Sequence, residues 1–244
     1  MRQFGVLLIV AATVLNLNGC KTDRASRETS TIDSRTNDLP KTDSSDATPP
    51  ATVQPLNNSQ DKRPLVVCFG DSLTAGYGTE AGQTYPDYLQ ADIDSRGYKY
   101  RVVNAGISGN TTKDGLERVH SIVAMKPAVV VVEFGGNDGL RGLRIEDTRD
   151  NLDKILQSLK SGGAKIVLAG ITLPPDYGPD YIKQFNTTYS LLAQKYHVPV
   201  LPFLLKGVFG VDGMMQSDRT HATASGNRVV AGNVLPFVTP LLTK

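Results

Sequence analysis

The sequence predicts an α/β protein, a three-layer α/β/α sandwich around a five-stranded parallel sheet, and two observations support this prediction. From about Arg63 onward, apolar runs typical of strands alternate with segments of helical periodicity. The strongest run, Ala-Val-Val-Val-Val-Glu-Phe at 128–134, is rich in β-branched residues and suits a central parallel strand. Strands that alternate with helices imply right-handed βαβ units, and therefore a parallel sheet covered on both faces.

Five strands are predicted in chain order, at Pro64–Phe69, Tyr100–Asn104, Ala128–Phe134, Lys165–Ile171 and Val198–Phe203. Five helices are predicted between and after them, at Tyr85–Ser95, Thr112–Met125, Asp147–Ser161, Asp180–Tyr196 and Ala224–Leu242. In the third helix, Asp147 and Thr148 are candidate N-cap residues, and Gly162-Gly163 ends the helical pattern.

Residues 1–19 have the features of a secretory signal peptide. Arg2 supplies a short positive region, and the apolar run Phe4–Leu15 is too short to be read first as a membrane span. The end of the segment, Leu-Asn-Gly-Cys at 17–20, resembles a bacterial lipobox, in which the cysteine receives lipid. We therefore expect a lipid anchor at Cys20, in the cell envelope facing the periplasm. The absence of an aspartate after Cys20 favours the outer membrane. The alternative is ordinary cleavage that leaves Cys20 as a free thiol.

The next segment, 20–62, is predicted to be a disordered tether. It is rich in Ser, Thr, Asp and Pro and nearly lacks large apolar side chains, so it buries too little surface to offset the entropy of ordering. A flexible chain of about 40 residues has a root-mean-square reach of roughly 35 Å. The tether would hold a domain at 63–244 near the membrane.

Composition excludes some classes of function. The formal net charge is only +2, and no basic block or aromatic-basic stripe indicates binding to nucleic acid. If Cys20 is acylated, Cys68 is the one remaining cysteine of the two, and no disulfide forms within the chain. Cys68 stands inside an apolar run, which favours a buried, inert thiol over a catalytic one.

Small polar segments follow each of the first three predicted strands. They read Gly-Asp-Ser at 70–72, Asn-Ala-Gly-Ile-Ser-Gly-Asn-Thr at 104–111 and Gly-Gly-Asn-Asp at 135–138. Any one of them could be an ordinary turn. The carboxyl ends of parallel strands meet at one edge of the sheet, where sites form, so the three segments together predict a site. Ser72 is the candidate nucleophile.

A serine nucleophile needs a base, because its hydroxyl is weak at neutral pH. His120 lies within a predicted helix, and His197 lies at a helix end, so both have ordinary structural explanations. His221 stands in a polar loop, three residues after Asp218. At this spacing the carboxylate can reach the imidazole Nδ1–H and leave Nε2 facing a nucleophile. Asp71, directly beside Ser72, is expected to structure the turn.

These residues together resemble the four sequence blocks of the SGNH, or GDSL, hydrolase family. Ser72 in Gly-Asp-Ser-Leu matches the nucleophile, and Gly109 matches the glycine of the second block. Asn137 in Gly-Gly-Asn-Asp matches the asparagine of the third block, and Asp218 and His221 match the fourth. The resemblance covers the chain from residue 65 onward and implies a flavodoxin-like fold.

Three further stretches look like the subfamily of bacterial thioesterase I, also called lysophospholipase and arylesterase. They are Gly-Gly-Asn-Asp-Gly-Leu-Arg-Gly at 135–142, Leu-Pro-Pro-Asp-Tyr-Gly at 173–178 and Leu-Pro-Phe at 201–203. The resemblance implies a serine carboxylic ester hydrolase that works through an acyl-enzyme. It also implies an oxyanion hole formed by the Ser72 and Gly109 backbone N–H groups and the Asn137 amide, with no metal or cofactor.

The fourth block departs from the family pattern at two positions. The family usually has Asp-Gly-x-His-Pro, whereas this chain has Arg219 in place of the glycine and Ala222 in place of the proline. The catalytic pair is retained, but the shape of the loop is open. Arg219 either places positive charge near the site or points to solvent.

The expected substrates are aryl esters, lysophospholipids and other acyl esters, handled by a monomer. Thioester cleavage is implied by the subfamily, although acyl-CoA is not expected outside the cytoplasm. One alternative is deacetylation of cell-envelope carbohydrate, which other family members perform. Another is a lipid-anchored binding module that kept the fold, against which the intact Ser72, Asn137, Asp218 and His221 argue.

Overall fold

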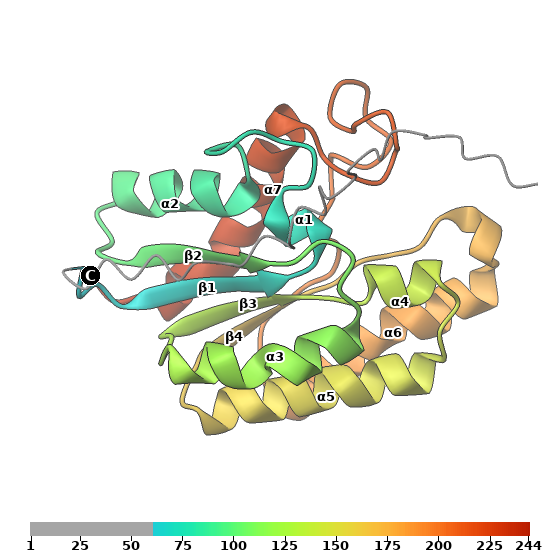
Figure 1. The fold of residues 1–244 in the computed structure, drawn as a ribbon, viewed down its shortest axis with the longest axis horizontal. Coiled ribbons are helices and arrows are strands. Elements are labelled where there is room, and N and C mark those ends of the chain that lie inside the picture. The colour runs from blue at the N-terminus through green and yellow to red at the C-terminus, as the bar shows by residue number, and fades with distance from the viewer. Residues whose placement is uncertain (1–60) are drawn as a thin grey trace, which may run out of the picture. The chain divides into compact units, whose positions relative to one another are not determined.

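The computed structural model describes residues 61–244 (Figure 1). The predicted signal peptide at 1–19, the lipidation site Cys20 and nearly all of the predicted tether lie outside the described residues. Within 61–244, none of the helices combines the length and apolar character that crossing a membrane requires.

The core of the domain is a sheet of five parallel strands, as predicted. In chain order they are β1 Leu65–Gly70, β2 Arg101–Gly106, β3 Val129–Glu133, β4 Lys165–Ala169 and β5 Val200–Leu201. Their order across the sheet is β2-β1-β3-β4-β5, and every neighbouring pair is parallel. The chain therefore first builds outward from β1 to β2 and then crosses back to β3, which places the nucleophile strand beside the central strand.

Helices cover both faces of the sheet. They are α1 Ser72–Ala75, α2 Tyr85–Ser95, α3 Thr112–Ala124, α4 Gly136–Leu140, α5 Ile145–Ser161, α6 Pro179–Tyr196 and α7 Ala224–Val238, with short 3₁₀ turns at Pro175–Tyr177 and Thr239–Leu241. Figure 1 shows α2 and α7 on one face and α3, α5 and α6 on the other. These are the three layers that the alternating pattern predicts.

The apolar strands explain the position of the core. Val66–Phe69 in β1 and Val129–Val132 in β3 are fully buried, because both strands are covered on the two faces of the sheet. Capping explains where several helices begin. Thr84 and Thr111 each accept a hydrogen bond from a backbone N–H of the following helix, and both helices have a complete capping box.

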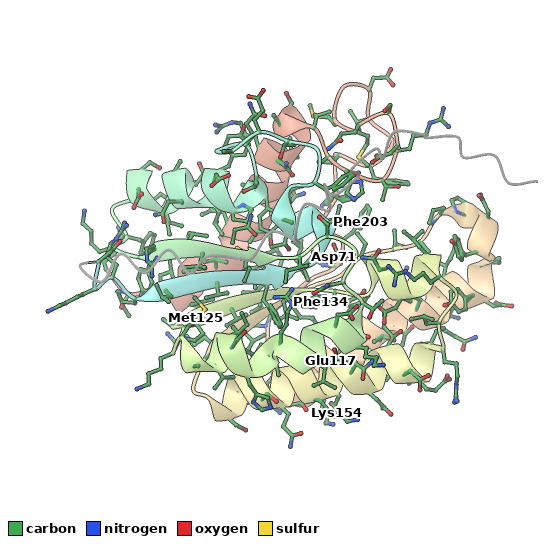
Figure 2. All side chains as sticks on the ribbon, in the orientation of Figure 1. Asp71, Glu117, Met125, Phe134, Lys154 and Phe203 are labelled. Carbon is green, nitrogen blue, oxygen red and sulfur yellow. The ribbon has the colours of Figure 1, made fainter. Side chains whose placement is uncertain are left out.

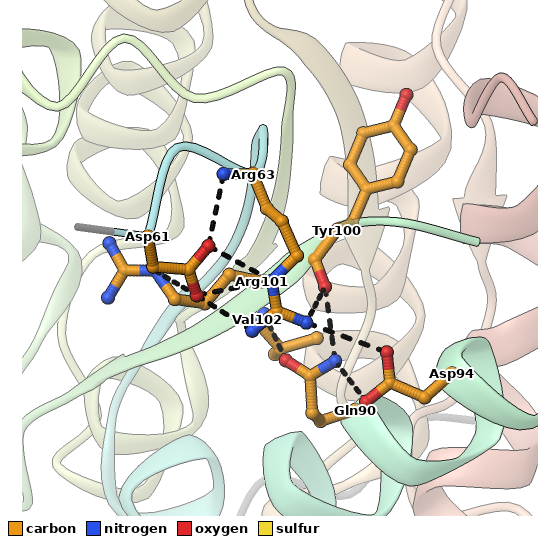
Figure 3. Close-up of polar contacts among 7 residues, drawn as sticks. All are labelled: Asp61, Arg63, Gln90, Asp94, Tyr100, Arg101 and Val102. Atoms are coloured by element: carbon orange, nitrogen blue, oxygen red, sulfur yellow. Dashed lines mark hydrogen bonds and ion pairs between the residues drawn. The ribbon is translucent and has the colours of Figure 1, made fainter. Parts of the chain in front are cut away.

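Polar contacts join the segment before β1 to the start of β2 and to α2 (Figure 3). Arg63 donates to the Tyr100 backbone oxygen at 3.2 Å and pairs with Asp61 at 2.7 Å. This hydrogen-bonded pairing lowers the pKa of Asp61 to about 2. Gln90 accepts from Val102 N at 2.7 Å, which joins α2 to β2. The described contacts thus begin at Asp61, within the stretch predicted as tether.

Several element boundaries differ from the predictions. Helix α5 begins at Ile145, because Arg144 is the N-cap and makes no side-chain capping bond. Asp147 lies instead in the first turn, where a carboxylate is favourable to the helix dipole. Helix α7 ends at Val238 and continues as a 3₁₀ turn, and β5 is only two residues long. The short helices α1 and α4 were not predicted.

Candidate active site

The three predicted polar segments meet at the carboxyl ends of β1, β2 and β3. A pocket of about 240 Å³ opens there, and its lining includes Ser72, Gly109, Asn137 and His221. Phe203, which follows β5, lines the same pocket. Figure 2 shows Asp71 and Phe203 at this end of the sheet. The fold thus brings every predicted pocket residue except Asp218 to the pocket wall, and Asp218 lies directly behind His221.

Ser72 is the first residue of α1, immediately after β1 ends at Gly70. The Asp71 side chain accepts from Leu73 N at 3.0 Å and caps this short helix, as expected of a residue that structures the turn. Gly70 leaves no space for a side chain, because a Cβ would collide with Thr74 Oγ1 and with the carboxyl of Glu133. The strand therefore turns sharply and presents the Ser72 hydroxyl at the sheet edge.

Ser72, His221 and Asp218 form a continuous chain of hydrogen bonds. His221 Nε2 lies 2.8 Å from Ser72 Oγ, and His221 Nδ1 lies 2.6 Å from Asp218 Oδ2. The other oxygen of Asp218 accepts from the backbone N–H groups of Thr220 at 2.9 Å and His221 at 3.0 Å. Although partial burial raises the pKa of Asp218, these hydrogen bonds outweigh it and hold the pKa below its ordinary value.

Backbone hydrogen bonds between residues 214–216 and 221–223 hold the loop that carries His221. Gln216 N donates to His221 O at 2.8 Å, and Thr223 N donates to Met214 O at 2.9 Å. The Gln216 side chain also donates to Tyr77 O at 2.7 Å, so the loop is joined to the segment after α1. The Tyr77 ring lies 4.7 Å from the His221 ring, centroid to centroid, and covers one side of the imidazole.

Donors for a negatively charged oxygen converge beside Ser72. The backbone N–H groups of Ser72 and Gly109 have no hydrogen-bond acceptor within residues 61–244, and both residues line the pocket. Gly109 has φ +81°, a conformation that favours glycine. Arg141 donates to the Gly109 carbonyl oxygen at 3.0 Å, which holds the peptide group that follows Gly109.

Asn137 reaches this position from α4, and its amide nitrogen makes two contacts. Nδ2 donates to Asp71 Oδ2 at 3.1 Å and to the backbone oxygen of Asn110 at 3.0 Å. The adjacent Asp138 is buried and accepts from Thr112 N at 2.9 Å, so α4 is fastened to the start of α3. The side chain of Asn137 is therefore placed by contacts from both neighbouring segments.

Two buried carboxyl groups lie under the nucleophile turn. Asp71 is 2% exposed and Glu133 is 0% exposed. Burial is the main cause of a rise in the pKa of Asp71 to about 6 and of a rise in the pKa of Glu133 well above its ordinary value. The second cause for Glu133 is the negative charge of Asp71 beside it.

Arg118 connects the ends of β1 and β2 to the loop around Gly109. Its guanidinium donates to Gly70 O at 2.8 Å, to Ala105 O at 2.9 Å and to Asn110 Oδ1 at 2.8 Å. It also lies 4.5 Å from the centre of the Phe69 ring. Burial lowers the pKa of Arg118 to about 10. The side chain is still a cation near neutral pH and binds three oxygen acceptors at once.

Most of the remaining pocket wall is apolar. Its side chains come from four segments of the chain and include Leu73, Tyr77, Leu140, Ile171, Leu173, Pro174, Phe203, Leu205 and Phe209. Phe209 is 44% exposed and lies at an angle to Phe203, with ring centres 6.2 Å apart. Such a wall fits a hydrocarbon chain.

The two departures from the family pattern have clear local explanations. Arg219 has φ +56°, a conformation that favours glycine, and its exposed side chain lines the pocket. Positive charge therefore does stand near the site. Ala222 is buried opposite Met215, and the two bonds of this pairing use the N–H groups of neighbouring residues. Because the N–H of Ala222 is not needed, alanine and proline both suit this position.

The remaining candidates lie away from the pocket. His120 is exposed on α3, and His197 is the C-cap of α6. Cys68 is buried in β1, and burial raises the pKa of its thiol to about 12, so it stays protonated. Within residues 61–244, no group of three or more His, Cys, Asp or Glu side chains is placed to hold a metal ion.

Sequence reasoning missed Glu133, Arg118 and Tyr77. Glu133 had a visible signal, because it is the one charged residue in the apolar run 128–134. Arg118 and Tyr77 had none, because their importance depends on which backbone oxygens and which ring the fold places beside them.

Comparisons with known proteins show which family this chain resembles. Residues 68–229 match the GDSL-like lipase/acylhydrolase family. Esterase TesA of Pseudomonas aeruginosa is 44% identical over 188 residues, which cover 77% of this chain and 94% of that protein. Thioesterase 1/protease 1/lysophospholipase L1 of Escherichia coli is 37% identical over 178 residues, covering 72% of this chain and 84% of that protein.

Solved structures agree in fold. The crystal structure of TesA superposes with a TM-score of 0.71 at 43% identity, covering 73% of this chain and 99% of that one. The SGNH-hydrolase family esterase AlinE4 gives a TM-score of 0.63 at 37% identity, covering 75% and 98%. None of these relatives is named as a carbohydrate deacetylase or a binding protein. The chain belongs to the GDSL-like lipase/acylhydrolase family, also called the SGNH hydrolases, and is a carboxylic ester hydrolase.

Proposed function

We propose that this hydrolase is a serine esterase that works through a Ser72–His221–Asp218 triad and an acyl-enzyme. The observation that carries the proposal is the continuous contact from Ser72 Oγ to His221 Nε2 at 2.8 Å and from His221 Nδ1 to Asp218 Oδ2 at 2.6 Å. His221 accepts the Ser72 proton as the oxygen attacks the acyl carbonyl. Asp218 holds the imidazole in the tautomer that this transfer requires and stabilises the imidazolium that forms.

The negative oxygen of the tetrahedral intermediate is held by three donors in this proposal. They are the N–H groups of Ser72 and Gly109, which have no acceptor within residues 61–244, and the side-chain amide of Asn137. Removing one donor of this kind typically costs about 10²–10³ in turnover. His221 then protonates the leaving alcohol or thiol. Water attacks the acyl-enzyme with His221 as base, which releases the acid and restores Ser72.

The apolar pocket wall supports acyl esters as the substrate class. Aryl esters and lysophospholipids combine an apolar acyl group with a leaving group that the open pocket mouth can accommodate. Relatives named arylesterase and lysophospholipase support the same range, and a relative named thioesterase supports thioester cleavage as a side activity.

The test is a comparison of wild type with Ser72→Ala on p-nitrophenyl esters, a lysophospholipid and an acetylated sugar. Loss of all hydrolysis with an unchanged melting temperature is the expected result, and undiminished turnover would sink the assignment. A fluorophosphonate probe should label the wild type at Ser72 and leave Ser72→Ala unlabelled. Preference for the acetylated sugar over every acyl ester would favour the deacetylase alternative.

We also propose that the enzyme is anchored in the bacterial envelope through lipid on Cys20, facing the periplasm. The lipobox-like sequence at 17–20 supports this proposal, and those residues lie outside the described structure. Labelling cells with a fatty-acid analogue should mark the wild type and leave Cys20→Ser unmarked. Release of wild-type enzyme into the soluble periplasmic fraction would contradict the anchor.

A further inference from the structure

The proposed triad and oxyanion hole leave two buried acids without a role, namely Asp71 and Glu133. Neither forms an ion pair within residues 61–244. The charged groups that act on Asp71 are His221 across the pocket, Glu133 below and the Arg118 guanidinium. Two buried carboxyl groups without a paired cation are costly for the fold, so their contacts call for an explanation.

The contacts of Asp71 lead to the oxyanion hole. Asp71 Oδ1 accepts from Leu73 N, and Asp71 Oδ2 accepts from Asn137 Nδ2 at 3.1 Å. An ionised carboxylate only accepts hydrogen bonds, so it requires the nitrogen of the Asn137 amide to face it. The Asn110 carbonyl, 3.0 Å from the same nitrogen, makes the same demand. A flipped amide would set its oxygen against both acceptors.

Glu133 supports Asp71 from below. Glu133 Oε2 accepts from Asp71 N at 3.2 Å and from Thr74 Oγ1 at 2.8 Å. Glu133 Oε1 is fully buried and has no hydrogen-bond partner within residues 61–244. An ionised carboxylate with an unpartnered buried oxygen beside a second carboxylate is strongly disfavoured. In the neutral acid, Oε2 still accepts both observed hydrogen bonds and Oε1 carries the proton. Glu133 is therefore the protonated member of the two.

We propose that Asp71 is a positioning residue for ester hydrolysis, whose buried carboxylate orients the Asn137 amide so that its nitrogen faces the reacting oxygen, while neutral Glu133 holds the Asp71 backbone in place. The inference rests on the proposed oxyanion hole. Both hydrogens of Asn137 Nδ2 have acceptors in this structure, one at Asp71 Oδ2 and one at Asn110 O. In this proposal the second hydrogen turns from Asn110 O to the oxyanion, while Asp71 keeps the first.

The proposal predicts different values of kcat for two isosteric substitutions. Asp71→Asn keeps the size and the helix cap but replaces an obligatory acceptor by an amide that can present either atom. We expect its kcat to fall about 10- to 100-fold with KM changed less than about threefold, because the donor acts mainly in the transition state. The matched control is Asp150→Asn on α5, an exposed carboxyl outside the pocket lining, and its kcat should stay within about threefold of wild type.

A double-mutant cycle with Asn137→Ala gives the decisive measurement. If Asp71 acts through Asn137, adding Asp71→Asn to Asn137→Ala lowers kcat by less than about threefold further. Additive losses would show that Asp71 acts elsewhere, for example on His221, and would overturn the inference. So would unchanged kcat in Asp71→Asn, or a loss in Asp150→Asn as large as that in Asp71→Asn. Full activity of Asn137→Ala would overturn the proposed oxyanion hole itself, and the role of Asp71 with it.

Discussion

Ser72 and His221 are separated by 149 positions in the chain, and yet Ser72 Oγ and His221 Nε2 are 2.8 Å apart. The opposite ring nitrogen contacts Asp218, so the imidazole is held in a single orientation. Asp218→Asn should therefore lower kcat about 10³- to 10⁴-fold, because an amide can stabilise the wrong tautomer and cannot stabilise the imidazolium.

Initial-rate kinetics on a p-nitrophenyl ester would measure this loss. Asp212→Asn, in the same loop and outside the triad, is the matched control and should retain wild-type kcat. A loss below about tenfold in Asp218→Asn would exclude Asp218 as the orienting acid.

The buried Glu133 predicts an unusual dependence of stability on pH. Its native pKa is raised above the ordinary 4.5, so the folded protein binds this proton more tightly than the unfolded chain. Stability from this group is full below pH 4.5 and declines as the pH rises toward the native pKa, by about 1.4 kcal/mol per pH unit. Glu133→Gln removes that decline.

Urea unfolding of wild type and Glu133→Gln at pH 5, 6 and 7 would measure the effect. The difference in the free energy of unfolding should shift in favour of the glutamine variant as the pH rises, by at most about 1.4 kcal/mol per pH unit. The same comparison in an Asp71→Asn background removes the titration of Asp71, whose charge acts on Glu133. A difference that stays constant with pH would mean that Glu133 ionises normally.

Arg118 should be irreplaceable by lysine. Its planar guanidinium donates to Gly70 O, Ala105 O and Asn110 Oδ1 together, and a lysine ammonium cannot match three directions from one point. We expect Arg118→Lys to lower the free energy of unfolding by about 2–4 kcal/mol, because buried acceptors lose their donor.

Arg144→Lys is the matched control for this substitution. The Arg144 side chain is 74% exposed, and its change should cost less than about 0.5 kcal/mol in the same urea experiment. Equal losses in the two variants would show that the contacts of Arg118 contribute no more than those of a surface arginine.

Phe209 should influence which acyl chains are hydrolysed. It lines the pocket, and its removal takes away apolar surface that a long acyl chain would contact. In Phe209→Ser, the ratio of kcat/KM for octanoyl to acetyl p-nitrophenyl esters should fall about 5- to 30-fold, which corresponds to the loss of about 1–2 kcal/mol of apolar contact.

Leu191→Ser controls for a general effect of removing surface apolar groups. Leu191 and Phe209 are both 44% exposed, but Leu191 lies on α6 and does not line the pocket. The ratio should be unchanged in Leu191→Ser. A parallel fall in both variants would assign the chain-length effect to general surface apolarity.

Much of this arrangement is visible in the sequence, because it depends on local pattern. The apolar run at 128–134 was enough to predict β3, and the spacing of Asp218 and His221, taken together with the other sequence blocks, predicted their contact. Parallel strands present their carboxyl ends at one edge, so the three polar segments were expected to converge, and they do.

Other features could not be predicted, some for local reasons and some because they depend on packing between distant segments. The start of α5 at Ile145 was missed because Arg144 caps the helix without a side-chain bond, while Asp147 looks like a cap. Helices α1 and α4 have only four and five residues, which is too short for a helical period to be visible in the sequence. The buried contacts of Glu133 and Arg118 arise only once β1, β2 and β3 lie side by side.

The long separation of Ser72 and His221 also bears on how the enzyme gains activity while it folds. The nucleophile belongs to the first strand and the base to the loop before α7, so a fragment that lacks either segment has no complete reaction centre. Helices can form early from local contacts, whereas this pairing closes a loop that spans the whole sheet. Recovery of ester hydrolysis after denaturation therefore reports completion of the domain, and circular dichroism should recover first.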